Sequence, residues 1–135
     1  MLSPMKIAIA LDDAIGQGFL ANASACIASG LFNNEEDVLG PEIEADHFRY
    51  IPITKIPILI VKKNNKGWKE LLNRAKKNKL KYMVFTREGQ STTSYEEYID
   101  RVKGKPLEEV NVIGIGVLGE DAIVQKFCGD LPLLR

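Results

Sequence analysis

The sequence predicts a three-layer α/β/α fold around a small mixed, mostly parallel sheet of about four strands. Three observations predict this class: short apolar runs typical of buried strands, amphipathic stretches with helical spacing, and regular alternation of the two along 135 residues. This length is close to the commonest size of one domain and is enough for one hydrophobic core. We therefore expect residues 1–135 to form a single domain.

Four apolar runs predict the strands. KIAIAL at 6–11 is closed by two aspartates, and ILIVK at 58–62 follows Pro57, which is tolerated at the start of a strand. KYMVFT at 81–86 is the third run. The fourth, VNVIGIGV at 110–117, contains two glycines and so suits a strand that a neighbouring element approaches closely.

Helical spacing of apolar residues predicts four helices. They cover 18–31, 66–78, 94–103 and about 120–127. The first is rich in small residues that let it lie close to a sheet. The third opens with Ser94 and Glu97, which match a capping box, and the last opens with two acidic residues that favour a helix start. The stretch 87–94 before the third helix is expected to be a polar loop.

The segment 33–55 is irregular, with two prolines and six acidic residues, and we expect an extended edge segment around 47–53. It contains His47, the single histidine, which is more often structural or exposed than catalytic when it stands alone. Residues 62–81 instead hold nine Lys or Arg and one acidic residue. This stretch is either a phosphate-binding face or a solvated helix face.

The composition favours no class of partner, because 18 basic residues balance 18 acidic ones. The two cysteines, Cys26 and Cys128, lack metal-ligand spacing and are expected to be buried or half-buried thiols. No apolar run approaches the roughly 20 residues of a membrane-spanning helix. We expect a cytoplasmic protein without a metal or other cofactor.

Three segments resemble the type II peptidyl-tRNA hydrolases. KIAIALDDAIGQGFLANASACIASG at 6–30 resembles the opening strand, glycine turn and Ala-rich helix of that family. The strand, helix and strand at 57–92, followed by a polar loop, and the closing strand and helix at 112–134 resemble the rest. The chain is most similar to a divergent sister group of small, uncharacterised prokaryotic proteins. The resemblance implies cleavage of the ester between a peptide and tRNA, with tRNA or a small anion as partner.

This chain departs from the hydrolase pattern in the turn before the first helix, within that helix and in the polar loop. Gln17 stands where the resemblance implies a lysine important for activity, and Arg87 stands where it implies an aspartate. The hydroxyl after the glycine of the polar loop has a counterpart in Ser91 or Thr92. A glutamine can donate a hydrogen bond to a developing oxyanion but supplies no charge.

The candidate site residues gather near the ends of the predicted strands, where ligands usually bind in α/β sheets. The catalytic candidates are Asp13, Gln17, Asn22, Glu88, Ser91 and Thr92, and the substrate-binding candidates are Arg87, Lys62 and Lys63. Asp13 or Glu88 could act as general base. For Asn22, a functional role and a bond to nearby backbone are equally open.

Two other functions stay open beside hydrolysis. One is a non-catalytic domain that binds a small ligand or RNA and kept the scaffold without the lysine. The other is a self-associating domain, expected as a homodimer, that uses the tyrosines Tyr50, Tyr95 or Tyr98.

Overall fold

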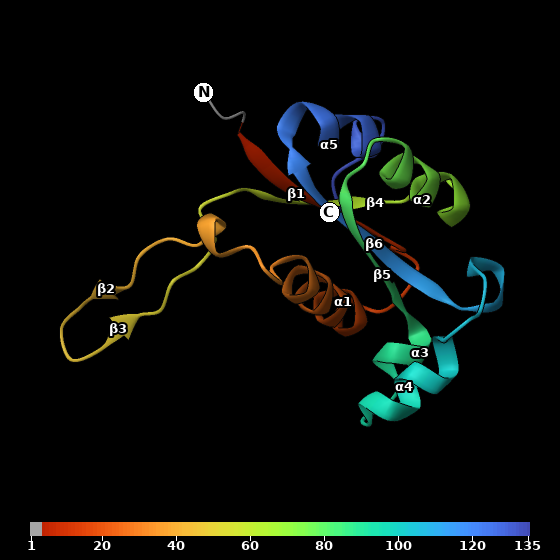
Figure 1. The fold of residues 1–135 in the computed structure, drawn as a ribbon, viewed down its shortest axis with the longest axis horizontal. Coiled ribbons are helices and arrows are strands. Elements are labelled where there is room, and N and C mark those ends of the chain that lie inside the picture. The colour runs from red at the N-terminus through yellow and green to blue at the C-terminus, as the bar shows by residue number, and fades with distance from the viewer. Residues whose placement is uncertain (1–3) are drawn as a thin grey trace.

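The computed structural model describes residues 4–135 and contains a mixed sheet of four strands (Figure 1). The strands are β1 (Met5–Leu11), β4 (Ile58–Lys62), β5 (Lys81–Thr86) and β6 (Val112–Glu120), in the order β4-β1-β6-β5. β1 pairs with β4 in parallel, and β6 pairs with β1 and β5 in antiparallel fashion. The predicted mixed α/β class is confirmed.

The sheet has fewer parallel pairs than the alternation of elements predicts. β1, β4 and β5 run in the same direction, but the central strand β6 opposes them, so only one of three neighbouring pairs is parallel. The physical reason lies between β5 and β6, where the chain stays at one end of the sheet instead of crossing back over a face (Figure 1). That connection returns the chain antiparallel to β5.

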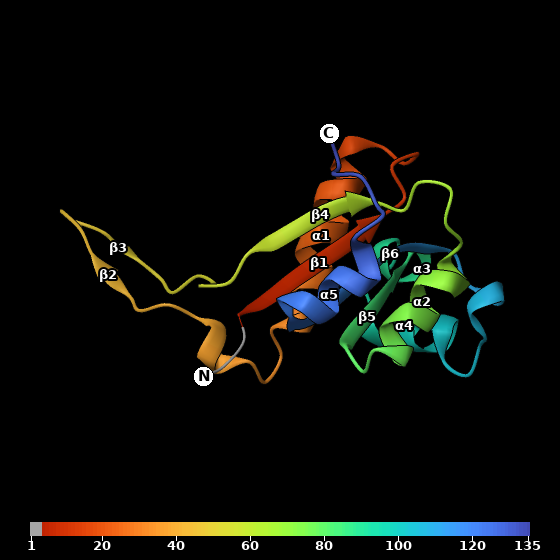
Figure 2. The ribbon, with the colours of Figure 1, turned by 90° about the horizontal axis from the view of Figure 1, so that it is seen from above.

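Helices cover both faces of the sheet, which gives the three layers (Figure 2). The bounds are α1 (Gln17–Leu31), α2 (Trp68–Lys77), α3 (Arg87–Gln90), α4 (Tyr95–Val102) and α5 (Asp121–Cys128), with 3-10 turns η1 (Glu36–Val38) and η2 (Leu107–Glu109). α1 packs on one face, and α2 and α5 pack on the other. The short helices α3 and α4 lie beyond the carboxyl end of β5.

The polar stretch 87–94 is partly helical instead of being a loop throughout. The buried side chain of Thr86 accepts a hydrogen bond from the Gly89 amide at 3.3 Å and so caps α3. The predicted cap of α4 is confirmed on one side, because the Ser94 hydroxyl accepts from the Glu97 amide.

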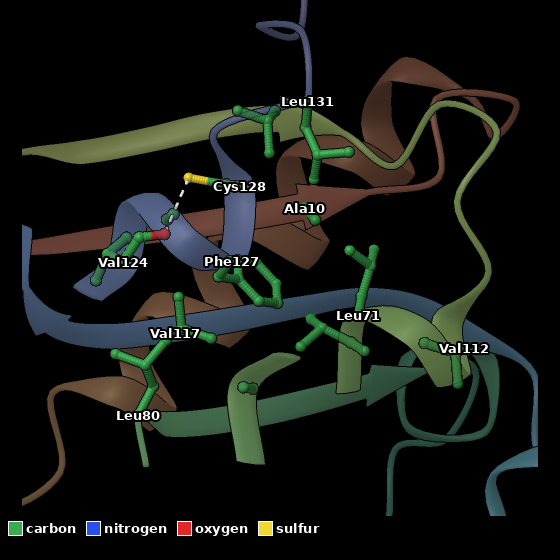
Figure 3. Close-up of a cluster of buried hydrophobic side chains, with 13 residues drawn as sticks. Ala10, Leu71, Leu80, Val112, Val117, Val124, Phe127, Cys128 and Leu131 are labelled. Carbon is green, nitrogen blue, oxygen red and sulfur yellow. Dashed lines mark hydrogen bonds between the residues drawn. The ribbon is translucent and has the colours of Figure 1, made fainter. Parts of the chain in front are cut away.

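The core between the sheet and the α2–α5 layer centres on Phe127, Leu71 and Val117, all with no exposed surface (Figure 3). Cys128 lies in this core, where its thiol donates to the Val124 carbonyl at 3.5 Å, and burial raises its pKa. Cys26 is half-buried on α1. The expectation of buried or half-buried thiols is therefore confirmed.

An ion pair ties α2 to α5 at the edge of this core. The Arg74 guanidinium donates to both carboxylate oxygens of Asp130, at 2.7 and 3.0 Å, and also to the Phe127 carbonyl. These hydrogen bonds lower the pKa of Asp130 to about 2.

The glycines of β6 let α1 approach the sheet closely, as the sequence predicts. A Cβ added at Gly116 would stand 2.3 Å from Cγ2 of Ile27, and one added at Gly114 would stand 2.7 Å from Cδ1 of the same residue. Ile27 and Leu31 have no exposed surface in this contact.

The two edges of the sheet differ. The C-terminal tail covers the edge of β4. The backbone amide of Lys62 donates to the Pro132 carbonyl, and the backbone amide of Leu134 donates to the Ile60 carbonyl. β5 is the opposite edge strand, and no further strand pairs with it within residues 4–135. No helix in that described part is long and apolar enough to cross a membrane.

A narrow hairpin, residues 40–55, projects from the body of the molecule (Figures 1 and 2). It contains β2 (Ile43–Glu44) and β3 (Arg49–Tyr50), so the extended segment expected at 47–53 is a strand over two residues only. His47 lies at its tip, exposed and with a φ of 66°.

Substitution of Gly116 by Ala is predicted to lower the free energy of unfolding by about 1–3 kcal/mol, because the added methyl overpacks the α1–β6 contact. Chemical denaturation measures the change. Gly18→Ala, in the first turn of α1, is the control, since a Cβ at Gly18 meets nothing within 4 Å. Equal stability of the two variants would contradict this packing.

Candidate ligand-binding site

The segments that carry the predicted site residues lie at one end of the sheet because three strands end there. β1, β4 and β5 end at this edge and β6 begins there, so the segments that follow Leu11, Lys62 and Thr86 meet at the same end of the molecule. Ligands of α/β sheets usually bind outside such carboxyl ends.

The turn after β1 leads into α1. The Asp12 carboxylate accepts from the Ala14 amide at 3.0 Å, which fixes the turn. Asp13 and Gln17 are exposed, and no hydrogen bond of their side chains to another residue is found within residues 4–135. α1 begins after Gly16, which gives the helix no side-chain cap.

A hydrogen-bonded chain joins α1 to α3. The Gln90 side chain donates to the Asn22 Oδ1 atom and to the Phe19 carbonyl, both at 3.0 Å. Gln90 Oε1 in turn accepts from the Arg87 guanidinium at 3.0 Å. The guanidinium also stacks 4.3 Å from the centre of the Phe19 ring. Asn22 therefore bonds to a side chain that is distant in the sequence and not to nearby backbone. This bond holds α3 against α1.

Glu88 is engaged with the start of β6. Its Oε1 accepts from both the backbone amide and the side-chain amide of Asn111, each at 2.9 Å. Partial burial raises the pKa of Glu88, but the hydrogen bonds from Asn111 and its own backbone, with the charge of Lys105, outweigh burial and leave the pKa low. A carboxylate held in its ionised form by structural bonds favours a positioning role over that of a general base.

The other predicted residues separate. The Ser91 hydroxyl accepts from the Arg101 guanidinium at 3.2 Å. Lys63 stands 5.7 Å from the centre of the Trp68 ring, toward α2, whereas the Arg87 network lies against α1. Lys62 is half-buried at the end of β4, across the sheet from β5.

A pocket of about 410 Å³ lies between α1, β5 and the α3–α4 segment. It is lined by Cys26, Ser29, Gly30, Met83, Phe85, Gly89, Thr92, Thr93, Ser94, Tyr95 and Tyr98. All of these side chains are formally uncharged. Thr92 is the only one of the predicted site residues among them.

The aromatic wall of this pocket is built by close contacts. Tyr95 and Tyr98 meet edge to face with ring centres 5.5 Å apart. Burial, with a smaller contribution from Tyr95, raises the pKa of Tyr98. A Cβ added at Gly89 would stand 2.9 Å from the Tyr98 ring, so the glycine permits this packing.

Sequence reasoning missed several residues of this region. Gln90 and Asn111 hold the network, and Met83, Phe85 and Tyr98 form the pocket. Gln90 stands three residues after Arg87, and Asn111 directly precedes an apolar run. Neither pattern indicates which residue far along the chain the side chain bonds to. Residues 4–135 hold no group of three or more His, Cys, Asp or Glu side chains that could bind a metal ion.

Glu88→Gln is predicted to lower the free energy of unfolding by about 1 kcal/mol at neutral pH, since a neutral amide accepts the Asn111 bonds less strongly. Because folding lowers the pKa of Glu88, its contribution is present above the unfolded value of 4.5 and is lost as the pH falls through the folded value. The difference from the parent chain should shrink in acid. Denaturation at several pH values measures it, with Glu96→Gln as the exposed control; a gap that widens in acid would contradict the assignment.

Comparison with known proteins places the chain in a family. No curated protein matches it. The solved structure of a protein of unknown function from Agrobacterium tumefaciens strain C58 is similar, with a TM-score of 0.87 and 18% identity over 100% of both chains, and at this identity it shows the fold alone. This structure and the matching family model are both described as of unknown function, so neither supports the resemblance to the peptidyl-tRNA hydrolases. That model, described as a protein of unknown function (DUF2000), matches residues 5–135, and the chain therefore belongs to the DUF2000 family.

Proposed function

We propose that this protein is a binding domain for a small, uncharged, planar molecule, which occupies the pocket between α1, β5 and α4. The observation that carries the proposal is the lining, which combines an apolar floor, an aromatic wall and a rim of hydroxyls without a charged side chain. A pocket of about 410 Å³ lies within the usual range for small-molecule sites.

The lining favours this ligand class in three ways. Met83 and Phe85 offer apolar surface from β5, and the Tyr95 and Tyr98 rings suit a planar group. Thr92, Thr93 and Ser94 place hydroxyls that can donate or accept hydrogen bonds at the rim. An ionised ligand would lose water here without gaining a countercharge, so a neutral one fits better.

The polar residues beside the pocket support binding more than chemistry. Asn22, Gln90 and Arg87 bond to one another, and Glu88 bonds to Asn111, so these groups serve to hold α3 in place. Holding α3 in place also positions Gly89, against which the Tyr98 ring of the wall packs, and this favours a preorganised binding site.

Thr93→Phe is predicted to fill the mouth of the pocket and to lower affinity for its ligand at least tenfold, without loss of stability, because Thr93 is exposed. A library of neutral aromatic and heteroaromatic compounds, screened by thermal shift and followed by calorimetry on the parent chain, supplies the ligand. Glu96→Phe, on α4 but outside the lining, is the control. Absence of any binder, or equal binding by Thr93→Phe, would contradict the proposal.

A second candidate is a divergent hydrolase of the peptidyl-tRNA type. It is favoured by the exposed Asp13 and Gln17 at the uncapped start of α1, at the same end of the sheet as Arg87. In this scheme Asp13 activates water and Gln17 donates to the oxyanion, while Asn22, Glu88, Ser91 and Thr92 shape the site. Arg87, Lys62 and Lys63 would contact the phosphates of tRNA.

Under this second candidate, the pure protein releases peptide from peptidyl-tRNA, and Asp13→Asn lowers kcat at least a hundredfold. A single-turnover assay at high protein concentration measures release. Gln17→Lys restores the lysine of the hydrolase pattern and should raise the rate of peptide release. Release no faster than in buffer alone would remove the hydrolase and leave the binding domain.

A further inference from the structure

The hairpin of residues 40–55, called the arm below, exposes a set of apolar side chains. Each of these is more than half exposed: Ile43, Phe48, Tyr50, Ile51 and Ile53. The strands of the arm pair only with each other within residues 4–135, each over two residues. Phe48 and Tyr50 pack edge to face at 5.2 Å. An isolated two-stranded hairpin is marginally stable in water, so the arm needs a partner surface.

The exposed apolar area of the arm is of the size that interfaces use. Five such side chains at roughly 100 Å² each give about 500 Å² per arm. When the arm is buried, a matching area of its partner is buried as well. In a reciprocal contact between two copies, both areas are buried twice. The total is then on the order of 2,000 Å², which is the range of stable protein interfaces.

The same chain also carries a surface groove. A hollow of about 440 Å³ lies beside the edge strand β5, between α2 and the α4–η2 segment. Its walls combine apolar side chains, such as Leu72, Val84 and Val102, with the polar groups of Tyr82 and Thr86. Lys76 and Lys105 line it as well. We call this hollow the β5 groove.

Charge makes the arm and the β5 groove complementary. Glu42, Glu44 and Asp46 flank the apolar residues of the arm, and of these Glu42 pairs with Arg49 of the same arm at 3.4 Å. Lys76 and Lys105 border the β5 groove. The whole chain has no net charge, so two copies do not repel each other at long range.

We propose that two copies of this chain form a twofold dimer in which the arm of each lies in the β5 groove of the other. Both complementary surfaces belong to one sequence, and this favours a second copy over an unrelated protein. A twofold axis makes the contact reciprocal, so that each copy gives one arm and receives one. Phe48 and Tyr50 supply the aromatic contact, and Glu44 and Asp46 face Lys76 and Lys105.

Charge reversal tests both the oligomeric state and which two surfaces meet in the dimer. The arm variant is Glu44→Lys with Asp46→Lys, and the groove variant is Lys76→Glu with Lys105→Glu. Each variant alone should be monomeric in sedimentation velocity, with a dimer dissociation constant raised at least tenfold. An equal mixture should sediment as a dimer, because a basic arm then meets an acidic groove and an acidic arm meets a basic groove.

Two further variants complete the design. Tyr50→Ser with Ile51→Ser removes apolar area from the arm and should also give monomers, while Lys79→Glu with Lys126→Glu, which changes the same charge elsewhere, should stay dimeric. Circular dichroism confirms that each variant is folded. A monomeric parent chain, a charge-reversed arm or groove variant that stays dimeric, or a mixture that stays monomeric would each overturn the proposal.

Discussion

The rest of this structure depends on the close contact between α1 and the central strand β6. Ile27 lies where side chains on β6 would otherwise stand, so the positions of Gly114 and Gly116 set the depth of the helix. A helix fixed at this depth places Asn22, five residues earlier, within reach of Gln90. The α1–α3 junction, and the pocket that it closes, follow from a contact made entirely by apolar atoms.

Much of the fold could be predicted because its signals are local. The run at 58–62 and the run at 81–86 are strands at the expected bounds, and the stripe that begins at Trp68 is a helix. The direction of β6 could not be predicted, since alternation does not say whether a connection crosses a face or stays at one end. The role of Thr86 as a helix cap could not be predicted either, because the segment after it was expected to be a loop and the cap requires the helical backbone of α3.

The site was harder to predict than the fold. The strand ends drew attention to Asp13, Arg87 and Glu88, which do lie at one edge of the sheet. What these residues bond to depends on partners far along the chain, such as Asn111 for Glu88. The pocket was missed because Met83 and Phe85 look like ordinary strand residues, and only the packing of α1 and α4 turns them into a floor.

We infer that the pocket under α4 binds a neutral planar ligand on a wall positioned by α1. The most direct measurement is nuclear magnetic resonance mapping of backbone amides during titration with neutral heteroaromatic fragments. We expect the largest shifts at Gly30, Gly89 and residues 92–94 around the pocket. Shifts that gather instead around Asp13, Gln17 and Lys62, with the pocket residues unchanged, would contradict it.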